Sequence, residues 1–468
     1  MAATLRYGTT ESRWVIAATA LGSGVAFLDG SVVNIALPAI ADDFHTSLAG
    51  LQWTVNAYLV MLSALLLLGG SLGDHFGRRR MYVAGLVGFT GASLLCGVAP
   101  STGFLVAARA LQGVGAALLV PGSLSIIAAS FDHEDRGAAI GAWSGLAGVA
   151  TALGPFLGGW LIEAASWRFI FLINVPLAGA AIAIALRHVP ESRAHDKRPL
   201  DLAGAAVVTL SLALLSYAAI DHAGTDSIVT GVLGAAAFVA FLLIEQRGAS
   251  PMMPLGLFKN AQFSGANLVT LAVYAALSGS LFLVTLQLQR TLDYSPLEAG
   301  AALVPFTILL LTISSTAGRV AQRIGPRLPM TIGPIFVTAG LLLFRGVGAG
   351  DHYFSGVFPA VMCMGFGMAI TVAPLTAAVL ADIDDEFTGI ASGVNNAVSR
   401  FAGLLAVAAL PALSGIGSGA TLRAGLHAGY ATAMTISAVA CAIGAAVAFA
   451  TIRTAAKVEH HKAHCRPC

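Results

Sequence analysis

Long apolar runs separated by short polar clusters dominate the chain. Cutting the sequence at polar clusters, Pro/Gly turns and charges leaves fourteen apolar segments, beginning near residues 14, 51, 81, 104, 137, 167, 200, 228, 262, 296, 328, 354, 388 and 427. An α-helix needs about 20 apolar residues to cross the hydrocarbon core of a bilayer. The pattern therefore predicts an all-α polytopic membrane protein with 14 transmembrane helices.

The composition excludes a soluble protein. Of 468 residues 57% are hydrophobic and 10% are charged, against roughly 25% charged in an ordinary globular protein. The apolar residues number about 267, which is material for roughly 13 purely apolar spans. The net charge of +2 is too small to indicate a nucleic-acid partner.

The basic residues indicate an orientation. With fourteen spans both termini share a side, and the loops on that side carry 19 Lys and Arg against 4 on the other. Arg109 and Arg400 fall inside spans. Because cytoplasmic loops are enriched in Lys and Arg, we expect a multi-pass plasma-membrane protein with both termini in the cytoplasm. The first apolar run, Trp14 to about Pro38, is too long for a signal peptide and is expected to stay as a helix.

Neither cysteines nor loops suggest a further module. Cys96, Cys363 and Cys441 fall inside predicted spans, which leaves no extracellular disulfide framework. The tail His460 to Cys468 holds side chains that bind zinc or copper, but nothing else positions them, so a solvated terminus without metal is the favoured interpretation. The longest interior polar stretch, Arg187 to Pro199, is too short to fold as a domain.

Two loops look like copies of one unit. The segment Gly70 to Arg80 aligns with Gly318 to Arg327, at an offset of 248 residues that is too long for a six-helix repeat unless two helices are inserted. Duplicated six-helix halves are a transporter architecture. We therefore expect an N-terminal half (1–190), an inserted helix pair (191–260), a C-terminal half (261–455) and a cytoplasmic tail (456–468).

Five strings in order carry a family resemblance. They are Leu28 to Pro38, Gly70 to Arg80, Arg109 to Gly115, Gly154 to Gly159 and Trp167 to Pro176. With these strings the chain resembles the major facilitator superfamily, and specifically its 14-helix drug:proton antiporter branch. The resemblance implies a major facilitator fold and proton-coupled efflux of hydrophobic or cationic drug-like compounds, with a proton gradient instead of a cofactor and with a monomer as the working unit.

The resemblance also implies roles for two motifs. The conformational latch comprises Gly70, Asp74, Gly77, Arg78 and Arg79; the second loop has Gln322 where the first has Asp74, so only the first copy carries it. Asp74 lies at a helix C-terminus, where the macrodipole disfavours an anion. Positive-inside anchoring explains the arginines equally well. The antiporter motif comprises Gly154, Pro155, Gly158 and Gly159, which close helix packing alone also explains.

Asp29 is the only carboxylate well inside a predicted span. It lies about 14 Å below Pro38, and Arg109 lies about 9 Å below Gly103, so the two depths agree within about one turn. We expect Asp29 and Arg109 to face one another across a central cavity. Burial favours the neutral carboxyl and Arg109 favours the anion, which suits a group that gains and loses a proton during transport. A fixed ion pair between the two helices is the alternative.

Several further residues are candidates for a substrate cavity. They are Asn34, Gln112, Tyr274, Met362, Met364, Phe366 and Arg400. Methionine adapts to many ligand shapes, although ordinary packing also explains these side chains. Arg400 lies about 16 Å into its helix, and is interpreted either as an anion site or as a cation satisfied by Asn395, Asn396 or backbone carbonyls.

The sequence argues against some alternative functions and leaves others open. The chain has no Gly-Lys pair and so no Walker A phosphate loop, which argues against an ATP-driven pump. A membrane-embedded enzyme should show clusters of Asp, Glu or His, and outside the tail the histidines are scattered singly. An importer, or an exporter of one specific metabolite, stays open.

Overall fold

The structure is a computed structural model that describes residues 5–194, 199–221, 225–248, 250–384, 387–416 and 421–453. Within these ranges it is helical, and β-pairing is limited to an isolated bridge between Leu5 and Phe131. Fourteen helical segments are long and apolar enough to cross a membrane. The predicted fold class and the predicted number of spans are therefore confirmed.

The N-terminal half comprises six spans. They are α1 (Thr10–Phe44), α2 (Leu48–Phe76), α3 (Arg78–Gly97), α4 (Thr102–Ser130), α5 (His133–Ala164) and the broken span α6 (Phe169–Leu172) with α7 (Asn174–His188). Helix α4 packs on both α2 and α3, and α1 packs on α5 and α7.

The C-terminal half repeats this arrangement. Its spans are α10 (Ala261–Arg290), α11 (Pro296–Ala302) with α12 (Val304–Ile324), α13 (Arg327–Phe344), the π-helix η2 (Tyr353–Val357) with α14 (Phe358–Leu380), α15 (Thr388–Leu413) and α16 (Leu422–Thr451). A 3₁₀ turn, η1 (Leu255–Lys259), precedes α10.

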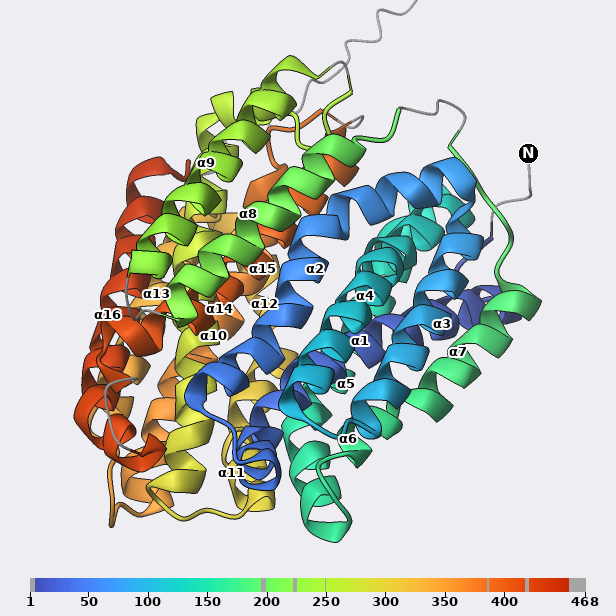
Figure 1. Cartoon of the computed structure of the whole chain (residues 1–468). Coiled ribbons are helices and arrows are strands. Elements are labelled where there is room, and N and C mark those ends of the chain that lie inside the picture. Colours follow the sequence, from blue (N-terminus) through green and yellow to red (C-terminus); the bar gives the residue numbers. More distant parts are fainter. Residues whose placement is uncertain are drawn as a thin grey trace, which may run out of the picture.

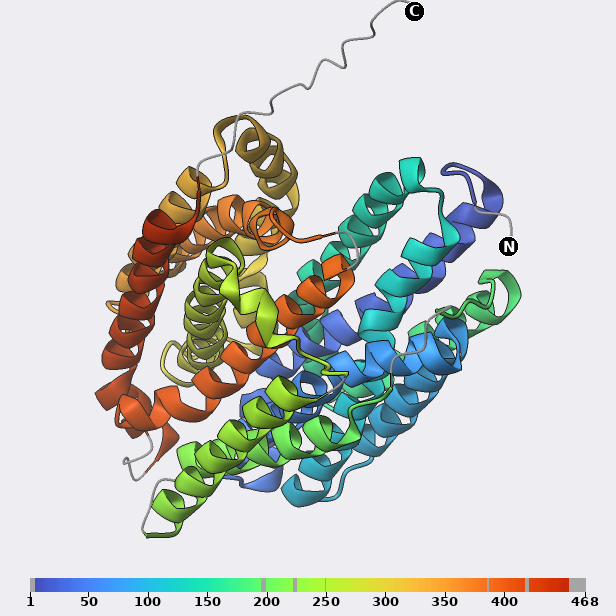
Figure 2. The ribbon, with the colours of Figure 1, turned by 90° about the horizontal axis from the view of Figure 1, so that it is seen from above.

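The remaining two spans, α8 (Leu202–Ile220) and α9 (Thr225–Arg247), form a hairpin outside the two halves. Helix α8 packs on α2 of one half and α15 of the other (Figure 1). Phe238 of α9 stacks on Phe401 of α15, with ring centroids 6.1 Å apart. Figure 2 shows the same hairpin along one flank of the bundle. The hairpin thus contacts both halves, and its origin as an insertion between them stays a prediction.

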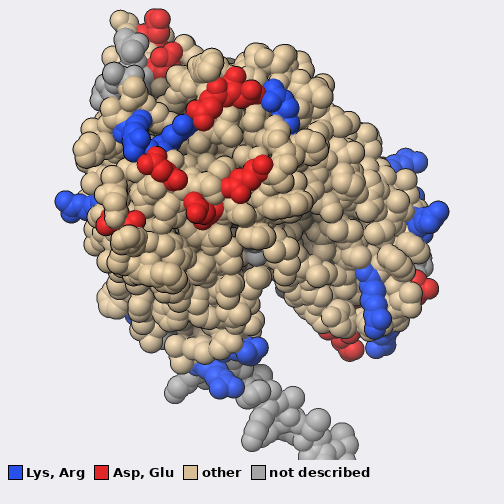
Figure 3. All heavy atoms as spheres, turned by 90° about the horizontal axis from the view of Figure 1, so that it is seen from below, with Lys and Arg blue, Asp and Glu red and all other residues tan. Residues whose placement is uncertain are grey.

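The two ends of the bundle differ, and we name them by the chain termini. At the termini end Leu5 donates its N–H to Ser130 O at 2.7 Å, and Arg453 donates its N–H to Gln262 Oε1 at 3.0 Å. At the far end acidic and basic side chains gather around a hollow (Figure 3). The hollow has a volume of about 730 Å³, and its lining includes Asp42, Arg290 and Arg423.

Proline residues shape the contact between the halves near the far end. Pro411 in α15 has no N–H, so the carbonyl of Val407 one turn earlier has no donor within its helix. Gln52 of α2 supplies that donor from the other half, with Nε2 at 2.8 Å from Val407 O and 2.9 Å from Ala408 O. Within a membrane each backbone carbonyl needs a partner, so this side chain joins the halves.

A second set of contacts joins α10 to α1, which contains Pro38. Gln289 Nε2 donates to Ile35 O at 3.0 Å, and Arg290 donates to Pro38 O at 2.8 Å and to Asp42 Oδ1 at 2.5 Å. Together with Gln52 these side chains close the far end of the seam between the halves.

Candidate functional site

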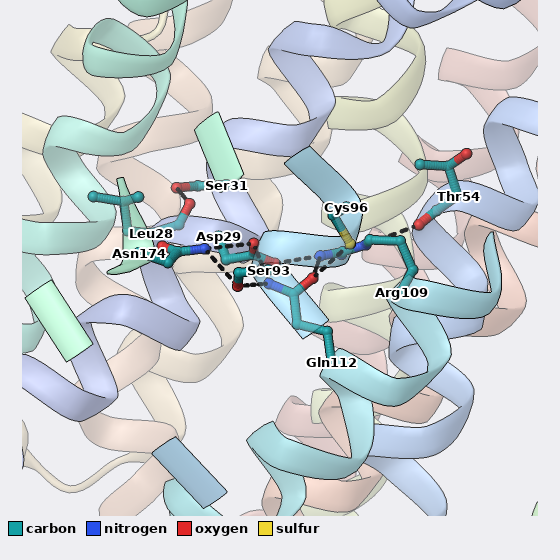
Figure 4. A network of polar contacts seen from close by, with 9 residues as sticks. All are labelled: Leu28, Asp29, Ser31, Thr54, Ser93, Cys96, Arg109, Gln112 and Asn174. Atoms are coloured by element: carbon teal, nitrogen blue, oxygen red, sulfur yellow. Dashed lines mark hydrogen bonds and ion pairs between the residues drawn. The ribbon is translucent and has the colours of Figure 1, made fainter. Parts of the chain in front are cut away.

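An ion pair lies at the centre of the N-terminal half. Arg109 Nη1 of α4 lies 2.5 Å from Asp29 Oδ2 of α1 (Figure 4). The other carboxylate oxygen, Oδ1, accepts from Gln112 Nε2 at 2.8 Å and from Asn174 Nδ2 at 3.2 Å. Both oxygens of Asp29 are therefore bound by side chains from α4 and α7.

The partners of Asp29 are themselves held in place. Ser93 Oγ of α3 accepts from Gln112 Nε2 at 2.9 Å and from Asn174 Nδ2 at 3.3 Å. Arg109 donates through Nη1 to Gln112 Oε1 at 2.6 Å and through Nε to Thr54 O at 3.1 Å. These bonds hold the side chains around the carboxylate in place.

Aromatic rings cover the arginine. The Arg109 Cζ lies 4.4 Å from the centroid of the Tyr58 ring and 5.7 Å from that of Phe171. Side-chain exposure is 0% for Asp29 and 1% for Arg109. The pair is thus enclosed by protein and shielded from solvent.

The location of Asp29 differs from the expectation of a group facing a central cavity. The accessible face of α1, which we call its central face, consists of Phe27, Gly30, Ser31 and Asn34. Asp29 follows Phe27 by two residues, about 200° around the helix, and points into the N-terminal half. Depth along the helix was predicted correctly, and the direction of the side chain was wrong. Gln112, also expected in the cavity, is fully buried beside Asp29.

Three partners of this site carried no role in the sequence analysis: Ser93, Asn174 and the carbonyl of Thr54. Ser93 and Asn174 are polar residues within apolar spans, and both are 0% exposed. That pattern was a usable signal, because buried polar groups need partners. The Thr54 carbonyl gives no signal in sequence.

The latch residues lie together at the termini end. Asp74 Oδ1 lies 2.7 Å from Arg78 Nη2, as an i,i+4 pair. Gly77 has a φ of 114°, which favours glycine, and a Cβ atom on Gly70 would lie 3.7 Å from Pro121 Cβ of α4. The switching role of these residues stays a prediction.

Glu191, in the segment after α7, was missed. Its Oε1 accepts from the backbone N–H of Arg79 at 3.1 Å, and its Oε2 lies 3.8 Å from Arg79 Nε. Since Gly77 offers α3 no side-chain cap, Glu191 caps this helix from another part of the chain. A carboxylate also suits the positive end of the helix dipole.

The antiporter motif presents two glycine faces. Gly154 and Gly158 pack on Ser31 and Val32 of α1, and leave no room for a side chain. One residue later, Pro155 and Gly159 contact α11 of the other half, where a Cβ on Gly159 would lie 2.7 Å from Leu297 Cα. Pairs of small residues at i,i+4 let helices approach closely, so α5 joins α1 and α11 near the far end.

The predicted cavity residues of the C-terminal half separate into two groups. Met364 is fully buried against Gly340 of α13, and Phe366 packs edge-on against Phe336 of α13 at 5.0 Å. Met364 therefore does not line an accessible cavity, because helix packing encloses it, and Phe366 contacts its neighbouring helix. Met362 is half-buried on α14.

Arg400, Tyr274 and Asn34 are all partly accessible, and Arg400 lies beside α1. The Arg400 Cζ is 5.8 Å from the centroid of the Phe27 ring on the central face of α1. Tyr274 of α10 is half-buried. Asn34 is half-buried on the central face of α1.

No metal centre is found in the described part of the chain, where no group of three or more His, Cys, Asp or Glu side chains comes together. The tail His460 to Cys468 lies outside the described residues, so the interpretation of that segment stays a prediction.

Known proteins share much of this sequence. The family model of the Major Facilitator Superfamily matches residues 19–407. The multidrug resistance protein Stp of Mycobacterium tuberculosis is 33% identical over 413 residues, covering 87% of this chain and 76% of its own length. The probable actinorhodin transporter of Streptomyces coelicolor is 34% identical, covering 86% of this chain and 72% of its own. The tetracenomycin C resistance and export protein of Streptomyces glaucescens is 32% identical, with 85% and 74% covered.

Solved structures agree at the level of the fold. A peptide transporter POT in complex with sulfate superposes with a TM-score of 0.70 at 13% identity, covering 95% of this chain and 94% of that one. A bacterial homolog of the lysosomal transporter Spinster, in an inward-facing conformation, gives a TM-score of 0.67 at 17% identity, with 95% and 97% covered. The matched residues, the two halves and these relatives agree, and the chain belongs to the major facilitator superfamily.

Proposed function

We propose that the chain is a secondary active transporter that exports hydrophobic, drug-like compounds in exchange for protons. The family and its relatives indicate a transporter of small molecules, and the relatives at about a third identity are named for multidrug resistance, antibiotic resistance and export. The 19 to 4 bias of basic residues supports a plasma-membrane location with cytoplasmic termini. On this proposal a monomer suffices and the proton gradient replaces a cofactor.

The observation that carries proton coupling is the enclosed pair of Asp29 and Arg109. While Asp29 is ionised, the two charges neutralise one another at a contact of 2.5 Å. A proton on Asp29 would leave Arg109 as an uncompensated cation within the membrane. Relief requires α1 and α4 to shift, or water to reach the guanidinium. Protonation is thereby coupled to the packing of the helices that carry the pair.

The energies are of the right size for a switch. Removing one partner of a buried ion pair costs about 3 to 5 kcal/mol. The membrane potential supplies about 2.3 kcal/mol per charge per 100 mV, and the pH gradient adds to it. One proton per cycle is therefore comparable to the cost of breaking the pair.

The test is Asp29→Asn, which keeps the size of the side chain and removes its titration. Purified protein would be reconstituted in liposomes with an imposed pH gradient, and the movement of a fluorescent hydrophobic dye and of protons would be recorded together. We expect dye movement to lose its dependence on the pH gradient. The exposed Asp226→Asn on α9 is the matched control and should transport normally.

Proton-coupled transport at the normal rate by Asp29→Asn would refute the assigned role of Asp29. The direction of transport is tested separately, because an importer of the same fold would raise, and an exporter would lower, the cellular accumulation of the dye on overexpression. Clear dye uptake into inverted vesicles without any proton movement would exclude an antiporter.

A further inference from the structure

Arg400 is a charged residue in the middle of a membrane span. It lies 12 residues after Thr388 and 13 before Leu413, the ends of α15, which is about 18 Å from either end at the helical rise. An ionisable side chain at this depth costs about 2.5 to 3.5 kcal/mol even on mild scales. Its position therefore needs a physical reason.

Few groups of the protein offset the positive charge of Arg400. Among the residues that the structure describes, no carboxylate and no hydrogen-bond acceptor pairs with it, and its recorded contact is the Phe27 ring at 5.8 Å. Asn395 donates instead to Asn267 and Thr270 of α10, and Asn396 donates to Ser392 O of its own helix. Satisfaction by these two amides, one of the interpretations from sequence, has no support in the hydrogen bonds.

The contrast with Arg109 is informative. Arg109 is 1% exposed and binds Asp29, Gln112 and the Thr54 carbonyl. Arg400 is half-buried and unpaired. Asp29 and Arg109 cancel, and the other described acids lie in loops or in the terminal turns of helices. Among the described residues deep within the spans, Arg400 is thus a positive charge that no acid compensates.

Arg400 lies at the contact between the two halves, beside α1 of the N-terminal half. Its neighbour Phe27 belongs to the central face of α1, where nothing lies within 4 Å of the position a Cβ on Gly30 would take. A partly accessible guanidinium beside an aromatic ring is a geometry for an acidic group attached to a flat apolar body, because guanidinium binds carboxylates through paired hydrogen bonds and stacks on rings.

We propose that Arg400 is an anion subsite of the transport site, and that the substrates are amphipathic aromatic compounds carrying a carboxylate or an ionised phenol. This inference rests on the proposed export function and names its substrate class. It replaces the expectation of a cationic drug bound by Asp29, since Asp29 is fully buried and has both oxygens bound. A small inorganic anion such as chloride shares the same chemistry.

Three probes with one aromatic body separate the alternatives: pyrenebutyrate, pyrenebutanol and pyrenebutylamine. Binding to the full chain in lipid nanodiscs is measured by equilibrium dialysis, with empty nanodiscs as background, at a pH where the acid is ionised and the amine protonated. Hydrogen bonds to charged groups contribute enough for roughly 10- to 100-fold in affinity. We expect the acid to bind at least about tenfold tighter than the amine.

The variants are Arg400→Gln, Arg400→Lys and, as a matched control, the exposed far-end Arg345→Gln. Arg400→Gln should lose the preference for the acid by about tenfold or more while binding of pyrenebutanol stays within about twofold, which also shows that the variant is folded. Arg400→Lys should keep part of the preference, and Arg345→Gln all of it. Equal binding of the three probes by the wild type, or an unchanged preference in Arg400→Gln, would overturn the proposal.

Chloride is distinguished by repeating the dialysis in a low-salt buffer with and without added chloride. If chloride weakens binding of pyrenebutyrate only when Arg400 is present, both anions share the subsite. If pyrenebutyrate binds independently of Arg400 while chloride alone protects the wild type against thermal unfolding, Arg400 holds a resident ion and the substrate proposal fails. Movement of pyrenebutanol driven by a pH gradient in liposomes tests the export function independently, so the two proposals fail separately.

Discussion

The hydrogen bond from Gln52 to the Val407 carbonyl should control how tightly the far end closes. Pro411 deprives this carbonyl of its partner within α15, and Gln52 of the opposite half replaces it at 2.8 Å. Replacing Gln52 with Leu removes the donor while keeping a side chain of similar volume. The closed seam then contains an acceptor without a partner, whereas an open seam exposes the same carbonyl to water.

The magnitude follows from the cost of an unsatisfied buried polar group, about 1 to 3 kcal/mol. This penalty falls on the closed arrangement alone, so the ratio of closed to open molecules should fall roughly 5- to 150-fold. Gln52 also lines the far-end hollow of about 730 Å³. Water entering from that hollow would reduce the effect toward the lower limit.

A double-mutant cycle tests the cause. In Pro411→Ala the new residue brings a backbone N–H that can bind Val407 O within the helix, so the carbonyl no longer depends on Gln52. We expect Gln52→Leu to open the far end in the wild-type background and to have clearly less effect in Pro411→Ala. Coupling energies between residues in contact are about 0.5 to 3 kcal/mol.

The assay is the distance between spin labels on Gly103→Cys and Arg345→Cys, in a chain whose native cysteines are replaced by serine. Both positions are exposed at the far end, one in each half. Opening would appear as a second, longer distance whose population gives the free-energy difference directly. Equal shifts by Gln52→Leu in both backgrounds would refute the reasoning, because the proline-freed carbonyl would then not be what Gln52 stabilises.

The architecture was predictable because the bilayer constrains it strongly. Spanning segments must satisfy their backbone bonds internally, so apolar length and loop charge were enough to count fourteen helices. The breaks within spans were not visible in this way. The short helix α6 ends before Asn174, and α11 ends at Ala302 before α12 begins, within runs that read as single apolar segments.

The sequence predicted the depth of Asp29 and Arg109 along their helices, but not the direction in which Asp29 points around the axis of α1. Counting residues placed Asp29 and Arg109 at one level, and they do contact one another. Which way Asp29 points was not decided by the pattern, because α1 is apolar on nearly all sides and its sequence shows no contrasting polar face. The packing of α3, α4 and α7 around the carboxylate settles the direction, and those contacts join residues up to 145 positions apart.

Contacts between distant segments could not be predicted either, because the local sequence does not identify a partner far away in the chain. The presence of Pro411 shows that the carbonyl of Val407 has no donor within its own helix. Nothing in the local sequence indicates that Gln52, 355 residues away, supplies the missing donor. Likewise Glu191 lies in a polar stretch that looked like a plain connection, and its value as a cap depends on Gly77 having no side chain to cap α3. Long-range polar partners require the fold itself.

Two further substitutions probe the ends of the bundle. Glu191→Gln removes the charged cap of α3 and the ion pair with Arg79, and should lower the free energy of unfolding by about 1 kcal/mol, seen as a lower melting temperature in detergent; an unchanged value would contradict the cap. At the far end, Gly159→Ala places a methyl group 2.7 Å from Leu297 Cα, closer than two carbons can approach. The halves must separate there, so the longer spin-label distance should gain population. Gly145→Ala is the matched control on the same helix, because nothing lies within 4 Å of its Cβ position. If both alanines opened the far end equally, lost flexibility of α5 and not contact with α11 would be the cause.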